Sequence, residues 1–151
     1  MNRAYFSLAL VMLVVATPLP LRAGTAAHLW SRGFGSVAGE YAWGVDVDAA
    51  GSTFVAGYFS GTINLGGADL TSAGNTDIFV AKYSPGGTHL WSQRFGGTSY
   101  DYAMDLCVDA QGKVLVTGYF QGTANFGGAD LTSAGSYDVF VAKFSSHGVH
   151  N

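Results

Sequence analysis

One segment of this chain occurs twice in succession, and that repetition limits the folds open to it. The two copies are residues 28–88 and 89–149, and 35 of their 61 positions are identical without any gap. The nonapeptide GGADLTSAG, for example, stands unchanged at 66–74 and again at 127–135. A repeat of this length is typical of architectures in which one supersecondary unit packs on copies of itself.

Each copy carries strand signals in the same order. In the first copy and its continuation, runs rich in β-branched and aromatic residues cover 41–49, 52–59, 77–83 and 89–95. The Gly-rich stretch 60–74 predicts a short hairpin, and no segment shows sustained helical periodicity. The repeat unit is therefore predicted to be a four-stranded antiparallel meander with a hairpin inserted between its second and third strands.

These units predict an all-β protein with two four-stranded antiparallel propeller-type blades, repeat 1 at 28–88 and repeat 2 at 89–151. Near-continuous apolar strands suit blades, because neighbouring blades cover both faces of each sheet. A sandwich of two sheets, one from each repeat, uses the same strands and stays an alternative. Since propellers have four to eight blades, two blades form an incomplete propeller with open faces and edges.

Residues 1–27 have the parts of a secretory signal peptide. Arg3 gives a basic start, residues 4–16 form an uncharged apolar run, and small residues follow two prolines. The apolar run is shorter than the roughly 20 residues that span a bilayer, so a retained membrane anchor is the weaker alternative. We predict that residues 1–27 are a signal peptide that is cleaved after Ala23 or Ala27. The mature protein is then expected to be secreted, periplasmic or on the cell surface, without other membrane contact.

Both ends of the repeat region cut across the repeat. Residues 28–34 match 89–95 and are therefore predicted to be an outer strand placed before the first blade. His150 begins a third copy, so the second blade lacks its own fourth strand. Two interpretations fit this pattern: a section of a longer array, or a protomer that completes a ring with other copies.

Charge and cysteine content exclude several classes of partner. From residue 28 onward five basic side chains face ten carboxylates, which leaves a net charge of −5 with neutral histidines. A basic stripe that could neutralise phosphates is absent from the sequence, so nucleic acid is not an expected partner. Cys107 is the one cysteine, cannot form an internal disulfide, and is predicted to be a buried apolar residue.

The sequence resembles a bacterial β-propeller repeat family known as SBBP. The second copy shows the pattern at Trp91, Phe95, Gly96, Tyr102, Ala103, Val108, Asp109, Gly112, Val116, Gly118, Asp138, Phe140, Val141, Ala142 and Lys143, and the first copy shows it at the equivalent positions. The resemblance implies an exported propeller scaffold and no catalytic residues. We therefore predict a non-catalytic scaffold or interaction module without a cofactor, which binds protein partners or itself through open blade faces.

Several polar residues are assigned structural roles, each with a functional alternative. Asp48 and Asp109 are predicted to cap turns, although Asp46-x-Asp48 faintly resembles the start of a calcium loop. Asp69 and Asp130 lie in the repeated nonapeptide. A role in a hairpin turn accounts for them as well as a role as calcium ligands does. A calcium-binding surface propeller is therefore an alternative function.

The remaining basic and aromatic candidates are interpreted in the same way. Lys82 and Lys143 are expected to pair with Asp77, Asp138 or a neighbouring blade. The histidines lack the short spacing of a zinc site, yet a cluster across blades stays an alternative. The tryptophans are expected in the core, with stacking of exposed rings on glycans as the alternative. These histidines and tryptophans are His28, His89, His150, Trp30, Trp43 and Trp91.

A polysaccharide hydrolase or lyase is a third interpretation. Such chemistry needs two carboxyl groups that face each other across about 5–9.5 Å. Glu40, Asp101 and Asp105 stand near the start of the first strand of each copy, and Glu40 aligns with Asp101. The sequence contains no other catalytic motif, so we predict a non-enzymatic module. A catalytic role for these three acids would contradict that prediction.

Overall fold

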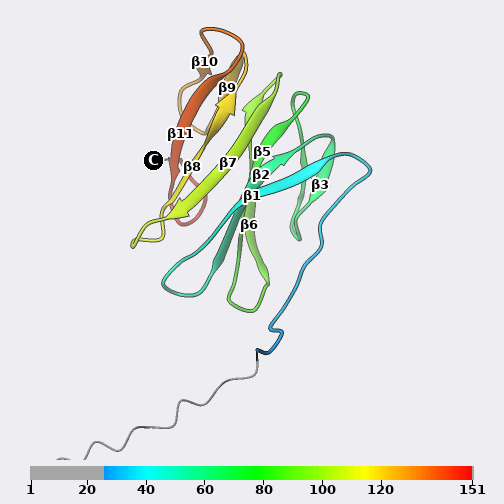
Figure 1. The fold of residues 1–151 in the computed structure, drawn as a ribbon, viewed down its shortest axis with the longest axis vertical. Helices are drawn as coiled ribbons and strands as arrows, with labels where there is room; N and C mark the ends of the chain where they lie inside the picture. The colour runs from blue at the N-terminus through cyan, green and yellow to red at the C-terminus, as the bar shows by residue number, and fades with distance from the viewer. Residues whose placement is uncertain (1–25, 151) are drawn as a thin grey trace, which may run out of the picture.

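The computed structural model describes residues 26–150, and within them the chain is all-β (Figure 1). The predicted signal peptide falls almost wholly on residues 1–25, outside the described residues. No helix in the described part has the length and apolar character needed to cross a membrane. The strands are β1 (Glu40–Val47), β2 (Thr53–Phe59), β3 (Thr62–Asn64), β4 (Asp69–Thr71), β5 (Asp77–Tyr83), β6 (His89–Gly97), β7 (Asp101–Val108), β8 (Val114–Phe120), β9 (Thr123–Asn125), β10 (Leu131–Thr132) and β11 (Asp138–Phe144).

Blade 1 is the antiparallel meander predicted from the first copy. Its strand order is β1-β2-β5-β6, and the hairpin β3–β4 is inserted between β2 and β5. The ladder between β2 and β5 is unbroken from Thr53–Tyr83 to Phe59–Asp77. The turn after β1 depends on Gly51, whose φ of 82° lies in the left-handed region that glycine adopts most readily.

Blade 2 repeats this arrangement but has three strands. Its order is β7-β8-β11, with the hairpin β9–β10 inserted between β8 and β11. The predicted four-stranded unit is complete in blade 1. Blade 2 has three strands within the described chain, in accord with the prediction that it lacks its own fourth strand, and that strand is represented only by a bridge between Phe144 and His150. Residues 139–143 of β11 form an open sheet edge within the described chain.

The two blades stack face to face, and this contact forms the main core. Phe54 and Val80 of blade 1 belong to the same buried cluster as Val116, Phe140 and Phe144 of blade 2. Strand β6 also extends past its own blade, since Gly96 and Gly97 pair with the hairpin strand β9. In a two-sheet sandwich the outer faces are polar, whereas here the outer faces are apolar, so the stack is propeller-type.

Residues 28–34 do not form the outer strand predicted for them. They lie in irregular conformation along blade 1, on the side away from blade 2 (Figure 1). The prediction failed because an extended segment becomes a strand only beside a hydrogen-bonded neighbour, and the described chain offers no sheet at that edge.

The position of this segment nevertheless follows the repeat. The indole Nε1 of Trp30 donates to Pro85 O at 3.0 Å, and Trp91 donates to Ser146 O at 3.1 Å, at the equivalent positions of the second copy. Phe34 stacks on Tyr83 as Phe95 stacks on Phe144. Residues 28–34 thus occupy on blade 1 the place that β6 occupies on blade 2.

The stacking predicts unequal effects for the same substitution in the two copies. Val80→Ala removes a fully buried side chain between the blades and is expected to lower the free energy of unfolding by about 2 kcal/mol. Val141→Ala, at the equivalent position, removes a side chain that is 69% exposed and is expected to cost less than about 0.5 kcal/mol. Urea unfolding in dilute solution measures both, and equal losses would contradict the packing.

Candidate interaction faces

The back face of blade 2 is an apolar sheet surface with no neighbour in the described chain. Val139 and Val141 are 77% and 69% exposed. Their counterparts in blade 1, Ile78 and Val80, are almost fully buried because blade 2 covers them. The back face also holds a shallow cavity of about 290 Å³. This face consists of Leu115, Thr117, Val139 and Val141, with Asp105 and Cys107 at the cavity margin.

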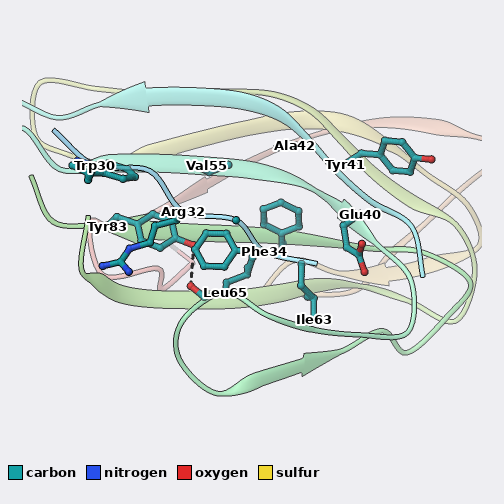
Figure 2. A pocket seen from close by; sticks show the side chains of 12 residues that line it. Trp30, Arg32, Phe34, Glu40, Tyr41, Ala42, Val55, Ile63, Leu65 and Tyr83 are labelled. Carbon is teal, nitrogen blue, oxygen red and sulfur yellow. Dashed lines mark hydrogen bonds between the residues drawn. The ribbon is translucent and has the colours of Figure 1, made fainter. Parts of the chain in front are cut away.

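The front face of blade 1 is the second open surface, and it is hollowed. A cavity of about 420 Å³ lies between the sheet, the hairpin β3–β4 and residues 28–34 (Figure 2). In blade 2 the equivalent surface is filled by the back face of blade 1. We define the front face by Val55, Ile63, Leu65, Phe79 and Tyr83, with Trp30 and Phe34 as its wall.

Tyr83 fixes the floor of this cavity. Its hydroxyl donates to Leu65 O at 2.9 Å, and the ring of Phe34 stacks on it with centroids 5.5 Å apart (Figure 2). Burial raises the pKa of Tyr83 to about 12, against the opposing charge of Arg32. The floor is therefore neutral and apolar at physiological pH, which suits an apolar partner surface better than a charged ligand.

A row of tyrosines connects the two blades on another surface. Tyr58 of blade 1 meets Tyr102 of blade 2 edge to face, with ring centroids 4.6 Å apart. Burial and the neighbouring Tyr102 raise the pKa of Tyr137, so its hydroxyl stays protonated. The tyrosine row consists of Tyr41, Tyr58, Tyr100, Tyr102, Tyr119 and Tyr137, of which Tyr41, Tyr100 and Tyr137 are exposed.

A buried acidic pair lies at the junction between the blades. Asp77 and Asp101 are both fully buried, and the guanidinium of Arg94 pairs with Asp77. Asp101 accepts a hydrogen bond from Gly97 N at 2.7 Å. Burial is the main cause of the raised pKa of Asp101, and the nearby Asp77 adds to it. Gly96 leaves room for this pair, since a Cβ there would lie 2.7 Å from Asp101 Oδ2.

The three acids of the hydrolase interpretation do not share a cavity. Glu40 lies at the edge of the front-face cavity and accepts a hydrogen bond from Ser36 Oγ. Asp105 lies at the back-face cavity, and Asp101 is buried at the blade junction. The alignment of Glu40 with Asp101 therefore reflects the repeat, and the structure brings no two of these acids together around one cavity.

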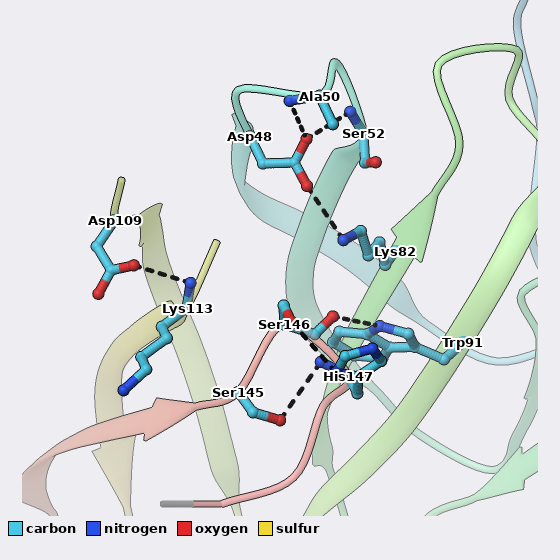
Figure 3. Close-up of polar contacts among 10 residues, drawn as sticks. All are labelled: Asp48, Ala50, Ser52, Lys82, Trp91, Asp109, Lys113, Ser145, Ser146 and His147. Carbon is cyan, nitrogen blue, oxygen red and sulfur yellow. Dashed lines mark hydrogen bonds and ion pairs between the residues drawn. The ribbon is translucent and has the colours of Figure 1, made fainter. Parts of the chain in front are cut away.

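The turn aspartates bind the backbone as predicted, but the lysine partners were predicted wrongly. Asp48 accepts from Ala50 N and Ser52 N and pairs with Lys82 at 3.1 Å (Figure 3). Asp109 caps its turn in the same way and pairs with Lys143 at 2.7 Å. Asp77 is not the partner of Lys82 because it pairs with Arg94 at the opposite end of β5.

These contacts also explain the ionisation of the turn aspartates. Burial opposes the charge of Asp48, but hydrogen bonds from Ser52 and Lys82 outweigh it and lower the pKa. For Asp109 the hydrogen bond from Lys143 is the main cause of the lowered pKa. Asp46 has a lowered pKa because Val108 N, on blade 2, donates to it at 2.7 Å. The carboxylate of Asp46 therefore ties the inner strands of the two blades together.

The aspartates of the repeated nonapeptide close the inserted hairpins. Asn64 Nδ2 donates to Asp69 Oδ1, and Asn125 Nδ2 donates to Asp130 Oδ1, both at 2.6 Å. Among residues 26–150 no group of three His, Cys, Asp or Glu side chains is close enough to hold a metal ion. Calcium binding stays an untested alternative for these loops.

The histidines make equivalent local contacts in the separate copies of the repeat. His28 and His89 each lie within hydrogen-bond distance of the serine three positions later, at 3.3 and 3.0 Å. His89 and His150 pack against the repeated Gly-Gly pairs 66–67 and 127–128. Their regular spacing is thus explained by the outer-strand position that they share.

Two buried-residue predictions were wrong. Trp43 is 53% exposed on β1, whereas Trp30 and Trp91 pack against the blades as expected. Cys107 is exposed rather than buried. It lies at the margin of the back face of blade 2, which no third blade covers in the described chain. The prediction of burial assumed a strand covered on both faces, and within the described chain no blade covers Cys107.

No protein-family model matches the chain. Among curated proteins, the chain is similar to an uncharacterized WD repeat-containing protein of Acanthamoeba polyphaga mimivirus, with 26% identity over 117 residues. The match takes in 66% of this chain but only 8% of the length of that protein. The likeness supports a propeller-type repeat, while the finer SBBP resemblance stays a prediction.

The acidic pair predicts a charge-dependent stability. Arg94→Met leaves Asp77 and Asp101 without their cation and is expected to lower the free energy of unfolding at pH 7 by about 2–3 kcal/mol. Asp101→Asn in the same chain should recover much of that loss, because one buried charge is removed. Because the folded-state pKa of Asp101 is raised, the folded state takes up the proton first, and the loss should shrink as pH falls through that pKa.

Urea unfolding at pH 7 and pH 5 measures these differences. Lys143→Met is the control, since its ion pair with Asp109 is screened by solvent and is expected to contribute little to stability. An equal loss from Arg94→Met with and without Asp101→Asn would contradict the coupling.

Proposed function

We propose that this chain is an exported, non-catalytic interaction module of the SBBP-type propeller kind, which binds protein through its open blade faces. The observation that carries the proposal is the equivalence between Val141, exposed on blade 2, and Val80, buried between the blades. The same apolar surface that binds a neighbouring blade inside the chain is thus presented to solvent. Contiguous exposed apolar surface of this kind is characteristic of protein interaction sites.

The two open faces differ in shape, and the difference suits protein rather than a small ligand. The front face is concave, lined by apolar side chains, and carries the neutral Tyr83 at its floor. The back face is flatter and consists of aliphatic strand residues. The WD repeat-containing relative supports a propeller-like interaction module in general terms.

The absence of catalysis is part of the proposal and has its own support. A pair of facing carboxyl groups is the minimum for the hydrolase interpretation. Within the described chain Glu40 and Asp105 line different cavities, and Asp101 is engaged with Gly97 N. These acids are better explained by the fold than by a reaction.

Photo-crosslinking tests the protein-binding proposal. The full chain is expressed in its own cells with a photoreactive amino acid in place of Phe34 or Val141. On irradiation, this residue is expected to form covalent adducts with other proteins. Ala50, in the exposed turn after β1, is the control position and should give few adducts. The chain recovered outside the cell should begin after Ala23 or Ala27. Adducts at Ala50 as frequent as at Val141, or a chain retained in the cell with residues 1–27, would contradict the proposal.

Glycan binding is a second candidate function, favoured by the tyrosine row. Tyrosine rings offer rigid amphipathic contact area at low entropic cost, and Tyr41, Tyr100 and Tyr137 present theirs to solvent in one continuous row. Tyr41 also lines the front-face cavity, whereas Tyr100 and Tyr137 line neither that cavity nor the one on the back face, so these two rings can bind glycan while the open faces bind protein.

A glycan array with the purified chain tests this second candidate. Tyr100→Ala and Tyr137→Ala together are expected to weaken any glycan signal at least tenfold, because both exposed rings are removed. Trp43→Ala removes an exposed aromatic ring outside the row and is the control. An array without signal, or a signal that the tyrosine variant keeps, would contradict the assignment.

A further inference from the structure

The junction where blade 1 continues into blade 2 holds two carboxyl groups that solvent does not reach. Asp77 begins β5 and Asp101 begins β7, and both side chains are fully buried. A Cβ placed on Gly96 would lie 3.2 Å from the Cγ of each, so the two carboxyl groups meet beside the same glycine. The backbone joins the two strands as well, because Asp101 N donates to Thr76 O at 3.0 Å. Both halves of this contact lie within the described residues.

One oxygen of each carboxyl group is hydrogen-bonded and the other is not. Asp77 Oδ2 accepts from Ala73 N at 3.0 Å and from the guanidinium of Arg94. Asp101 Oδ2 accepts from Gly97 N at 2.7 Å. Asp77 Oδ1 and Asp101 Oδ1 are buried and have no hydrogen-bond partner within the described chain. Because a buried acceptor without a donor is costly, two such atoms in one contact indicate a donor that both share.

The charges at the junction favour the uptake of one proton. Among the charged groups of the described chain, Asp77 on β5 and Arg94 on β6 act on Asp101. The hairpin strand β9, which pairs with the end of β6, carries no ionisable side chain. Two carboxylates against one guanidinium leave a net negative charge among buried groups. Neighbouring buried carboxyl groups avoid such a charge by sharing a proton.

We propose that Asp101 takes up a proton from solvent as the pH falls and donates it in a hydrogen bond to Asp77 Oδ1, which makes this contact an acid-strengthened latch between the blades. The single proton turns Asp101 Oδ1 into a donor and gives Asp77 Oδ1 a partner, so both buried oxygens are satisfied at once. Gln121 N also faces Asp101, but its hydrogen bond goes to Tyr100 O at 3.1 Å. The latch adds a hydrogen bond between β5 of blade 1 and β7 of blade 2.

The direction of the pH effect follows from the burial of Asp101. Burial is the main cause of its raised pKa, and the charge of Asp77 adds to it, whereas Gly97 N and Arg94 oppose it. A group whose pKa is raised by folding stabilises the folded chain below its ordinary pKa, and this stabilisation is lost as the pH rises through the folded-state value. Each unit of the rise is worth about tenfold in the unfolding equilibrium. The latch is therefore closed in acid and open at higher pH.

Opening of the latch acts on the strand pairing that surrounds it. Gly97, whose amide donates to Asp101, also pairs with Ala124 of β9. A Cβ on Gly97 would lie 1.9 Å from Thr123 O, so β9 lies directly against this turn. This pairing holds the inserted hairpin of blade 2 on the outer strand of blade 1. Repulsion between two charged carboxylates is expected to loosen it before the rest of the stack.

Amide hydrogen exchange of the full chain at pH 4 and pH 7 tests the latch. After correction for the intrinsic pH dependence of exchange, the amides of Gly97 and of β9 are expected to be about tenfold better protected at pH 4. Asp101→Asn keeps a donor toward Asp77 at every pH, so its protection should be equal at the two pH values. Glu40→Gln changes the equivalent residue of the first copy and should behave as the native chain does.

The turn aspartates do not produce the same change. Asp46, Asp48 and Asp109 have lowered pKa values, so they stay charged at pH 4. Equal protection of the native chain at both pH values, or a pH dependence that Asp101→Asn retains, overturns the latch. A cation held between the two carboxylates would be released in acid, so better protection at pH 7 overturns the latch too.

Carbon-13 NMR of the side-chain carboxyl groups is a second readout and needs no variant. The Cγ resonance of Asp101 is expected to titrate at a higher pH than an ordinary aspartate does. Titration of Asp101 in the ordinary range overturns the inference, even where Asp101→Asn does not fold. Neither readout depends on the binding of a partner, so the latch and the interaction function proposed above can fail independently.

Discussion

The contact between the back face of blade 1 and the front face of blade 2 is the interaction on which the rest of the structure depends. It buries Phe54, Ile78 and Val80 against Phe140 and Phe144 and forms the main core. Each isolated sheet would expose two apolar faces to water, which costs free energy roughly in proportion to the apolar area exposed. Stacking removes one face of each sheet from water, and the repeat ensures that the next face is built to the same pattern.

That pattern explains why each blade of the described chain has one open apolar face. A stack of identical units always leaves one front face and one back face open unless it closes on itself. Blade 1 partly covers its front face with residues 28–34 and the hairpin β3–β4, which leaves the cavity of about 420 Å³. Blade 2 has no equivalent cover for Val139 and Val141 within the described chain. These open apolar surfaces are thus a consequence of the architecture of the described chain.

The polar residues mostly maintain this architecture. Asp48 and Asp109 hold the turns between the first two strands of each blade, Asp46 joins the inner strands, and Asp69 closes a hairpin. Sequence reasoning found the turn aspartates because their Gly-containing turns are local. It missed the partnership of Asp77 with Arg94, which joins the neighbouring strands β5 and β6 across 17 positions of sequence. It also missed the burial of Asp101, which lies against the end of β6 in the other blade.

The sequence by itself determined the repeat, the order of the strands and the inserted hairpins. These follow from local alternation, turn residues and the period of the repeat, which can all be read without knowing what packs on each strand. Only the tertiary structure decided that residues 28–34 are not a strand, that Cys107 and Trp43 are exposed, and that Lys82 pairs with Asp48. Most of these depend on whether a neighbouring blade is present, and a repeated sequence looks the same at the end of a stack as in its middle.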